Sequence, residues 1–420
     1  MWALLRRRTL TQWILIAMAL GTLIGWAAPD MAGSLKPLST MFLRMIKSIV
    51  VPIIFGTLVM GIAGHGDDLR RVGRLAFKSL VYFEIVTTLA LVIGLLAVNL
   101  VRPGDGVQLP PSATGAVVGS GQITFASVLE HIVPQSVFEA AVHNEVLQIV
   151  FWSVLFALAL TQVREGPKAF MLKLCEGLTE VMFKFTGIVM RFAPIGIGAA
   201  IAVTVGHSGL GILSNLGKLV LTLYGALVVF GLVVLLPVAW IAKVPLGRFL
   251  KAVKEPALIA FSTTSSEAAL PKAMVQMESI GVPRRIVAFV MPTGYSFNLD
   301  GSTLYLAVAS IFAAQAAGVH LTVGQQLLMM FTLMVTSKGV AGVPRASLVI
   351  LSGTLASFNL PLEAVAVILG VDELMDMART TVNLVGNCLA TVVMARWEGE
   401  YDGAAPSAAT VPAESQAQAG

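Results

Sequence analysis

The stretch DELMDMARTTVNLVGN, at positions 372–387, places polar side chains at regular intervals in the most apolar half of the chain. Two carboxylates, a guanidinium and two amides follow one another at spacings of four, three, four and four, namely Asp372, Asp376, Arg379, Asn383 and Asn387. Such spacing stacks side chains on one face of a helix. The intervening residues are apolar enough for lipid, where a charged side chain costs at least about 2.5–3.5 kcal/mol. This face therefore predicts a polar cavity in a membrane protein that moves a polar solute.

The composition indicates the same class of protein. Of 420 residues, 56% are hydrophobic and only 12% are charged, and the mean hydropathy is +0.85. A spanning helix needs about 20 apolar residues, and the clearest such runs cover 13–28, 79–101 and 219–242. The net charge of +5 comes from basic residues between the apolar runs. This is the pattern of cytoplasmic loops, so we expect a lipid bilayer and no nucleic acid as partner.

Composition and motifs also argue against metal chemistry and catalysis. The chain has two cysteines, Cys175 and Cys388, both in apolar surroundings, and five scattered histidines. Neither residue type shows the spacing of a metal site or a disulfide framework. No HExxH or GxSxG motif is present. We therefore expect no enzyme activity, no cofactor and no bound metal, apart from a co-transported cation.

Charge asymmetry predicts a topology for residues 1–245. Arg6, Arg7 and Arg8 place the N-terminus in the cytoplasm, because basic residues stay inside. The segment 103–145 has no Lys or Arg after Arg102 and is predicted to be external. Basic loops then alternate with uncharged ones up to Lys254. This gives six spans in the first part of the chain.

Residues 246–398 break this alternation. The polar run 262–267 has basic residues on both sides, which predicts a helical hairpin that enters and leaves from one side of the membrane. Asn298-Leu-Asp-Gly-Ser302 interrupts an apolar helix and predicts a locally unwound span. A second hairpin is predicted over 325–360 with its tip at 339–344, followed by the polar-faced helix 362–397. Residues 399–420 are predicted to form a disordered cytoplasmic tail.

Each polar constellation has a structural and a functional interpretation. Asp376 and Arg379 could form a packing ion pair, or hold a solute that carries both a carboxylate and an ammonium. The 298–302 stretch could be a simple kink, or a site for a small cation or proton. The run 262–267 could be a plain loop, or a tip whose amides bind a carboxylate. Glu84 could make a structural hydrogen bond, or carry a proton.

Four motifs, taken together, resemble the dicarboxylate/amino acid:cation symporters, known as the glutamate transporter family. They are SSEAALP (265–271), PTGYSFNLDGS (292–302), SKGVAGVP (337–344) and DMARTTVN (376–383), and the likeness extends from about residue 11 to 397. The nearest resemblance is to bacterial proton/glutamate–aspartate symporters. It implies eight transmembrane helices, two re-entrant hairpins, a homotrimer in the bacterial inner membrane, and both termini in the cytoplasm. It also implies an elevator motion of a transport domain, formed by residues 246–398 with part of 1–245, against a scaffold for trimerisation formed by the other helices of 1–245.

The resemblance further implies a substrate site and a coupling site. Arg379 would take the side-chain carboxylate of glutamate or aspartate, and Asp376 its amino group. The substrate-binding residues implied are Ser265, Ser266, Ser302, Val343, Asp376, Arg379, Thr380 and Asn383. The cation or proton residues implied are Glu84, Thr87, Thr88, Gly294, Asn298, Asp300, Asn383 and Asn387, where Asn298 and Asp300 could alternatively hold sodium.

Departures from the family bear on the coupling ion. Asn387 stands where sodium-coupled relatives carry an aspartate, and Glu84 stands where they can carry a tyrosine. If Glu84 faces Asp300, the two carboxyls would share one proton, so we expect proton coupling. Arg345 also departs from a frequent glycine, and its role stays open. The alternatives are sodium-coupled glutamate/aspartate symport, proton-coupled C4-dicarboxylate symport and, in a different class, an anion channel.

Overall fold

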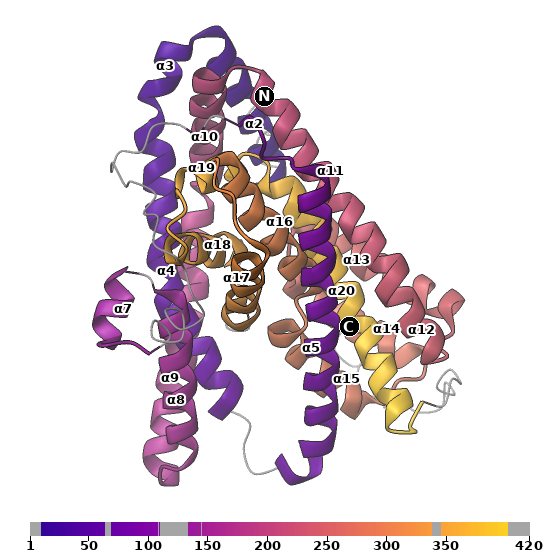
Figure 1. Ribbon diagram of the computed structural model, residues 1–420. Coiled ribbons are helices and arrows are strands. Elements are labelled where there is room, and N and C mark those ends of the chain that lie inside the picture. Colours follow the sequence, from indigo (N-terminus) through magenta and orange to yellow (C-terminus); the bar gives the residue numbers. More distant parts are fainter. Residues whose placement is uncertain are drawn as a thin grey trace, which may run out of the picture.

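The computed structural model describes residues 10–63, 69–107, 109, 133–143, 145–337 and 346–401. Every regular element within these ranges is a helix (Figure 1). This confirms the predicted all-helical class, and it follows from the composition, because a chain in lipid must satisfy its backbone groups within each helix or in a closed barrel.

By chain order alone, the helices before and after residue 245 make a first and a second group. The first group contains α2 (Leu10–Ala27), α3 (Pro29–Ser34), α4 (Lys36–Ala63), α5 (Leu69–Val101), α7 (Val137–His143), α8 (Val146–Thr161), α9 (Glu165–Met190), α10 (Ala193–Ser208), α11 (Gly211–Phe230), the π-helical turn η1 (Gly231–Leu235) and α12 (Leu236–Ile241). The second group contains α13 (Leu246–Thr263), α14 (Ser266–Ser279), α15 (Arg284–Phe297), α16 (Asp300–Ala316), α17 (Val323–Thr336), α18 (Ala346–Ser357), α19 (Glu363–Leu369) and α20 (Asp372–Trp397).

Several helices can cross a bilayer by length and composition. In the part of the chain that the structure describes, three stretches qualify singly: Phe77–Val101, Gly211–Ile241 and Arg284–Ala316. Helices α9 and α10 qualify as a fourth span if they are taken together across a bend of 51°. A proline, Pro194, stands at the start of α10, where its ring and missing N–H explain the bend. These findings establish a multi-pass membrane protein, while the count of eight spans stays a prediction.

Helices α13 and α14 pack against each other as a helical hairpin at the predicted place, while its entry and exit from one side of the membrane stay a prediction. Thr264 reverses the chain in the left-handed conformation, with φ of 52°. Ser265 then caps α14 by accepting a hydrogen bond from the Ala268 N–H at 3.2 Å, as serine does at helix starts. Helices α17 and α18 frame the second predicted hairpin, whose predicted tip at 339–344 lies outside the described residues.

The predicted interruption between residues 298 and 302 is also present. Asn298 and Leu299 leave the helical conformation between α15 and α16. The remainder of α16 is almost wholly buried. The break therefore lies inside the protein, where irregular backbone at membrane depth is tolerated.

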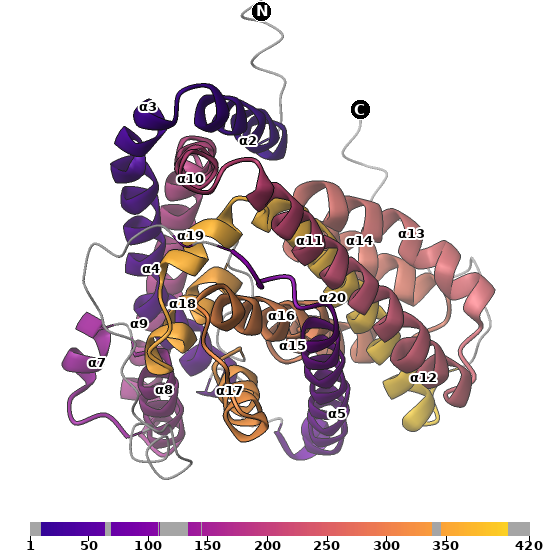
Figure 2. The ribbon, with the colours of Figure 1, turned by 45° about the horizontal axis from the view of Figure 1, so that its top comes forward.

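Helix α20 lies at the centre of the second group and packs against α13, α14, α15, α16, α11 and α5. In Figure 2 it runs along α11, with α13 and α14 on one side and α15 and α16 on the other. A second set of contacts joins α2 to α10, and α4 to α8 and α9. The candidate site residues are thus carried by helices that converge on α20 from both ends of the chain.

Candidate functional site

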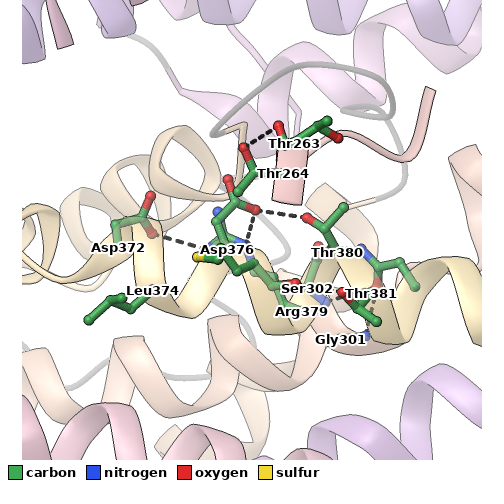
Figure 3. Close-up of polar contacts among 12 residues, drawn as sticks. Thr263, Thr264, Gly301, Ser302, Asp372, Leu374, Asp376, Arg379, Thr380 and Thr381 are labelled. Atoms are coloured by element: carbon green, nitrogen blue, oxygen red, sulfur yellow. Dashed lines mark hydrogen bonds and ion pairs between the residues drawn. The ribbon is translucent and has the colours of Figure 1, made fainter. Parts of the chain in front are cut away.

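The polar face of α20 is buried and internally bonded. Arg379 is only 1% exposed, and its Nε donates to Asp376 Oδ1 at 2.9 Å. The hydroxyl of Thr380 donates to the same oxygen at 2.9 Å. Figure 3 shows these three side chains together, with Thr263 and Thr264 of the first hairpin turn beside them. The helical spacing of the sequence therefore produces the common face that it predicts.

Arg379 has two further neighbours, of which the sequence pattern places only Asp372 on this face. Its Nη1 donates to Asp372 Oδ1 at 3.1 Å, and its guanidinium carbon lies 4.1 Å from the centre of the Tyr305 ring. Asp372 is seven residues before Arg379, two helical turns away, as the predicted spacing requires. Tyr305 is on α16, and only the packing of α16 on α20 brings it there.

The charges of this group do not cancel. Two carboxylates, Asp372 and Asp376, surround the single guanidinium of Arg379, so the formal sum is −1 when all three are ionised. Buried charges are tolerated when they are paired and hydrogen-bonded. A ligand carboxylate can bind Arg379 only by competing with these aspartates, whereas a ligand ammonium would meet a surplus of negative charge. The arrangement suits a ligand that brings both groups.

Asn383 connects the polar face to the broken helix. Its Oδ1 accepts the Gly301 and Ser302 N–H groups at 2.8 and 3.2 Å, and its Nδ2 donates to Ser302 Oγ at 2.9 Å. The first N–H groups of a helix lack intrahelical partners, and here a side-chain amide satisfies two of them. A Cβ at Gly301 would overlap the Arg379 carbonyl. Glycine is therefore required for α16 to approach α20 this closely.

The predicted coupling residues of α15, α16 and α20 form a second, deeper cluster. Asn298, Asp300 and Asn387 are each 0% exposed, and Asn298 Nδ2 donates to Asn387 Oδ1 at 3.1 Å. The Asp300 carboxylate packs against Gly386, where a Cβ would overlap it. Gly294 likewise lies against the Asn387 amide. The structure thus brings together four of the predicted residues.

Helix α5 adds further oxygens to this region. Thr87 is buried, and Tyr82, which the sequence did not indicate, is 7% exposed with its hydroxyl within electrostatic range of Asp300. Thr87 Oγ1, Tyr82 Oη and Asn298 Oδ1 have no hydrogen-bond partner among the residues described. Buried oxygens of this kind are ligands for a small hard cation or sites for a proton. The described residues include no group of three or more His, Cys, Asp or Glu side chains that could hold a metal ion.

Other predicted residues are more peripheral. Glu84 is half-buried, and its backbone carbonyl accepts the Thr88 hydroxyl at 2.7 Å. Thr88 is exposed and also contacts Met334 Sδ of α17 at 3.7 Å. Ser266 is half-buried at the start of α14, and its carbonyl accepts the Tyr295 hydroxyl at 2.9 Å. Val343 and Arg345, from the second predicted tip, lie outside the described residues.

The chain matches the model of the sodium:dicarboxylate symporter family over residues 10–397. The chain belongs to this family. It is 43% identical over 408 residues to the proton/sodium-glutamate symport protein of Geobacillus stearothermophilus, covering 95% of this chain and 96% of the relative. It is 42% identical over 410 residues to the proton/glutamate-aspartate symporter of Escherichia coli (strain K12), covering 93% of each.

Relatives of different specificity are nearly as similar. The C4-dicarboxylate transport protein of Laribacter hongkongensis (strain HLHK9) is 41% identical over 396 residues, covering 93% of this chain and 89% of the relative. Family membership establishes a transporter and confirms that the chain is not an enzyme. It also confirms the resemblance drawn from the four motifs. Identity values this close do not separate the amino-acid carriers from the dicarboxylate carriers, so specificity has to be argued from the site.

Proposed function

We propose that this symporter imports the acidic amino acids glutamate and aspartate together with protons. The observation that carries the proposal is the position of Asp376 beside Arg379, in a buried group with one more carboxylate than guanidinium. Arg379 holds the side-chain carboxylate through paired hydrogen bonds, and Asp376 holds the ammonium. The hydroxyl and amide groups of Thr380, Asn383 and Ser302, with the tip residues Ser265, Ser266 and Val343, complete the substrate site.

The charge balance separates this proposal from C4-dicarboxylate transport. Succinate or malate brings two carboxylates and no ammonium, so Asp376 would face an anion with no compensating group. Like charges brought together in a buried site disfavour binding by several kcal/mol. The same bonded site, with Arg379 only 1% exposed, favours a carrier over an anion channel, which needs no tight substrate face.

The proposed coupling ion is the proton. Asn387 supplies a neutral amide to the deep cluster, which leaves Asp300 as its carboxylate on α15, α16 and α20. A sodium site is strengthened by anionic ligands that balance the full charge, whereas a single buried carboxylate can load and release a proton. Glu84 on α5 is the second carboxylate of this proposal. Sodium coupling through Thr87, Thr88, Asn298 and Asp300 is the alternative.

Uptake of labelled glutamate into proteoliposomes tests the proposal. An inward proton gradient without sodium should drive uptake, whereas an inward sodium gradient at equal pH on both sides should not. Sodium-driven uptake would refute proton coupling. Uptake of succinate without glutamate under either gradient would refute the assignment of Asp376 to an ammonium.

The role of Glu84 has its own test. Glu84→Gln keeps the size of the side chain and removes its proton, so net proton-driven uptake should fall while exchange of internal for external glutamate persists. Glu139→Gln, which changes a carboxylate of α7 outside both clusters, serves as the control. Unchanged proton-driven uptake in Glu84→Gln would remove this residue from the coupling site.

The proposed architecture is that of an elevator carrier. A homotrimer of chains in the bacterial inner membrane, each with eight spans, two re-entrant hairpins and cytoplasmic termini, would move residues 246–398 and part of 1–245 against a scaffold formed by the other helices of 1–245. Residues 399–420 would form the cytoplasmic tail, although its first residues are bonded to the rest of the chain through Glu400 and Tyr401. Accessibility of single cysteines placed at Ser34 and Gly281 to an impermeant reagent, in intact and in broken cells, tests the orientation. Chemical cross-linking in membranes tests the trimer.

A further inference from the structure

The five residues Trp397–Tyr401 make contacts with elements far away in the sequence. They begin with the last residue of α20, in a stretch rich in charged and aromatic side chains. Together with Arg396 they bond to α5, to the turn after α12, to the end of α14 and to the start of α15. We call these five residues the C-terminal clasp.

The contact with α5 is the most tightly built. Glu398 accepts hydrogen bonds from Lys78 Nζ at 2.6 Å and from Arg74 Nη2 at 2.8 Å. Lys78 also donates to the Trp397 carbonyl at 3.3 Å and lies 5.5 Å from the centre of the Trp397 ring. The Glu398 side chain is only 7% exposed and that of Lys78 22%, whereas that of Arg74 is 74% exposed. The shielded Lys78–Glu398 pair therefore differs from the solvent-exposed ion pairs that contribute almost nothing.

The other end of the clasp fastens the first hairpin and α15. The Tyr401 hydroxyl is buried and donates to the Ile280 carbonyl, just after α14, at 3.1 Å. Glu400 accepts a hydrogen bond from Arg285 Nε, at the start of α15, at 2.8 Å. Arg396 stacks its guanidinium 4.2 Å from the centre of the Tyr401 ring and donates to the Lys243 carbonyl at 3.1 Å.

The elements held by the clasp are those that carry the candidate site. Helix α5 carries Thr87 and Tyr82, α14 begins at Ser266, α15 ends just before Asn298, and α20 carries the polar face. Lys78 of α5 and Glu398 are 320 residues apart in the chain. The opposite end of α5 is bonded as well, since the Val98 carbonyl accepts from Gln315 Nε2 at 3.2 Å and Asn99 Nδ2 donates to Gln326 Oε1 at 2.8 Å. We propose that the clasp is a positioning device, which fixes the Lys78 end of α5 so that its oxygens meet those of α15, α16 and α20.

The distances make this positioning effective. Lys78 precedes Thr87 by nine residues, so the salt bridge lies about 13 Å along the same rigid helix from the Thr87 hydroxyl. A helix transmits an axial shift or a rotation at one end to side chains two or three turns away. Asn298, Asp300 and Asn387, together with the oxygens of α5, make up what we call the coupling cluster. This cluster is sensitive to small shifts of α5, because its oxygens must converge on one small ion or proton. The substrate group, by which we mean Asp372, Asp376, Arg379 and Thr380 of α20, depends on the position of α5 far less.

This inference rests on the proposed function for its transport measurement. It predicts that weakening the clasp impairs the response to the coupling cation more than the affinity for substrate. Glu398→Gln should raise the cation concentration that gives half-maximal uptake by at least about threefold, while the KM for substrate at saturating cation changes less than about twofold. The doubly exchanged variant Lys78→Glu with Glu398→Lys should recover most of the loss, since the attraction is restored with opposite polarity. Glu255→Gln, which removes a carboxylate paired with Lys272 across the first hairpin, is the matched control.

Hydrogen exchange of the backbone amides in residues 79–90 provides a readout that needs no transport. Exchange should be faster in Glu398→Gln than in the wild type and in Glu255→Gln. Unchanged exchange would refute the clasp as a support for α5. If exchange is faster in Glu398→Gln but the cation concentration for half-maximal uptake is unchanged, the clasp stabilises α5 without positioning the coupling cluster. That result would also overturn the proposal. If the wild type carries succinate instead of glutamate, the proposed function fails, and the same cation titration is made with succinate.

Discussion

The group around Arg379 and the coupling cluster are neighbours on α20, but only the first has a charged group whose partners are supplied by the protein. Asp372 and Asp376 accept hydrogen bonds from the guanidinium of Arg379, and the Tyr305 ring lies against it, although the Tyr305 hydroxyl has no hydrogen-bond partner among the residues described. In the coupling cluster, Thr87 Oγ1, Asn298 Oδ1 and Tyr82 Oη are buried without hydrogen-bond partners among the residues described. Buried polar atoms cost free energy unless they are paired.

The difference indicates two kinds of binding. The substrate group is pre-organised and must exchange an internal ion pair for a ligand, so its affinity depends on how well the ligand replaces what it displaces. The coupling cluster gains partners when a cation or proton enters, so occupancy stabilises it. Transport would require both ligands if binding at either cluster changes the geometry of Asn383 and of the start of α16, which lie between the two clusters. The following changes test that contrast.

Replacing the guanidinium should have the largest effect. Arg379→Gln leaves Asp372 and Asp376 buried without their cation, and breaking a buried pair typically costs about 3–5 kcal/mol. We expect uptake to fall by at least about 100-fold, with a lower yield of folded protein. Glutamate binding by purified protein is the measurement, and Thr381→Val, which removes a half-buried hydroxyl of α20 bonded only to its own helix, is the control. Near-normal binding would contradict the assignment.

The next largest effect is a change of specificity. Asp376→Asn keeps an acceptor for Arg379 and Thr380 but removes the charge that we assign to the substrate ammonium. The KM for glutamate should rise about 10- to 100-fold, and succinate should become a better competitor than it is in the wild type. Competition of both compounds against labelled aspartate measures this ratio. A parallel loss for glutamate and succinate would mean that Asp376 only positions Arg379.

The features of the fold and site that could be predicted from the sequence are those determined by residues close together in the chain. The face of α20 and the break at Asn298 were predictable, because a helical period and an Asn-Leu-Asp-Gly interruption act within a few residues. The turn within 262–267 was predictable from its polar run between flanking basic residues, although not its exact position at Thr264. The place of Tyr305 under Arg379 was not, since it depends on the packing of α16 on α20. Nor were the contacts of Glu398, because its partners are about 320 residues away.

A smaller effect is expected from the unassigned hydroxyl in the coupling cluster. Tyr82→Phe removes one buried oxygen and keeps the ring, and a typical hydrogen bond contributes about 0.5–1.5 kcal/mol. The cation concentration for half-maximal uptake should rise roughly threefold, with the substrate KM unchanged. Tyr224→Phe, which removes a hydroxyl bonded to the Leu374 carbonyl, is the matched control. Equal cation titrations for both variants would place Tyr82 outside the cluster.

The smallest expected effect is on the pH dependence of the melting temperature, through Glu398 of the clasp. Hydrogen bonds from Lys78 and then Arg74 hold the pKa of Glu398 below its usual value of 4.5. A carboxyl whose pKa is lowered by folding stabilises the folded state above its unfolded pKa, and this contribution disappears as the pH falls through the folded value. The wild type should therefore unfold at a higher temperature than Glu398→Gln at pH 7, and the two melting temperatures should converge as the pH falls below 4.5 and through the lowered folded-state pKa of Glu398. A difference that persists in acid would mean that the charge of Glu398 contributes nothing, and that the glutamine perturbs the packing of Trp397 instead.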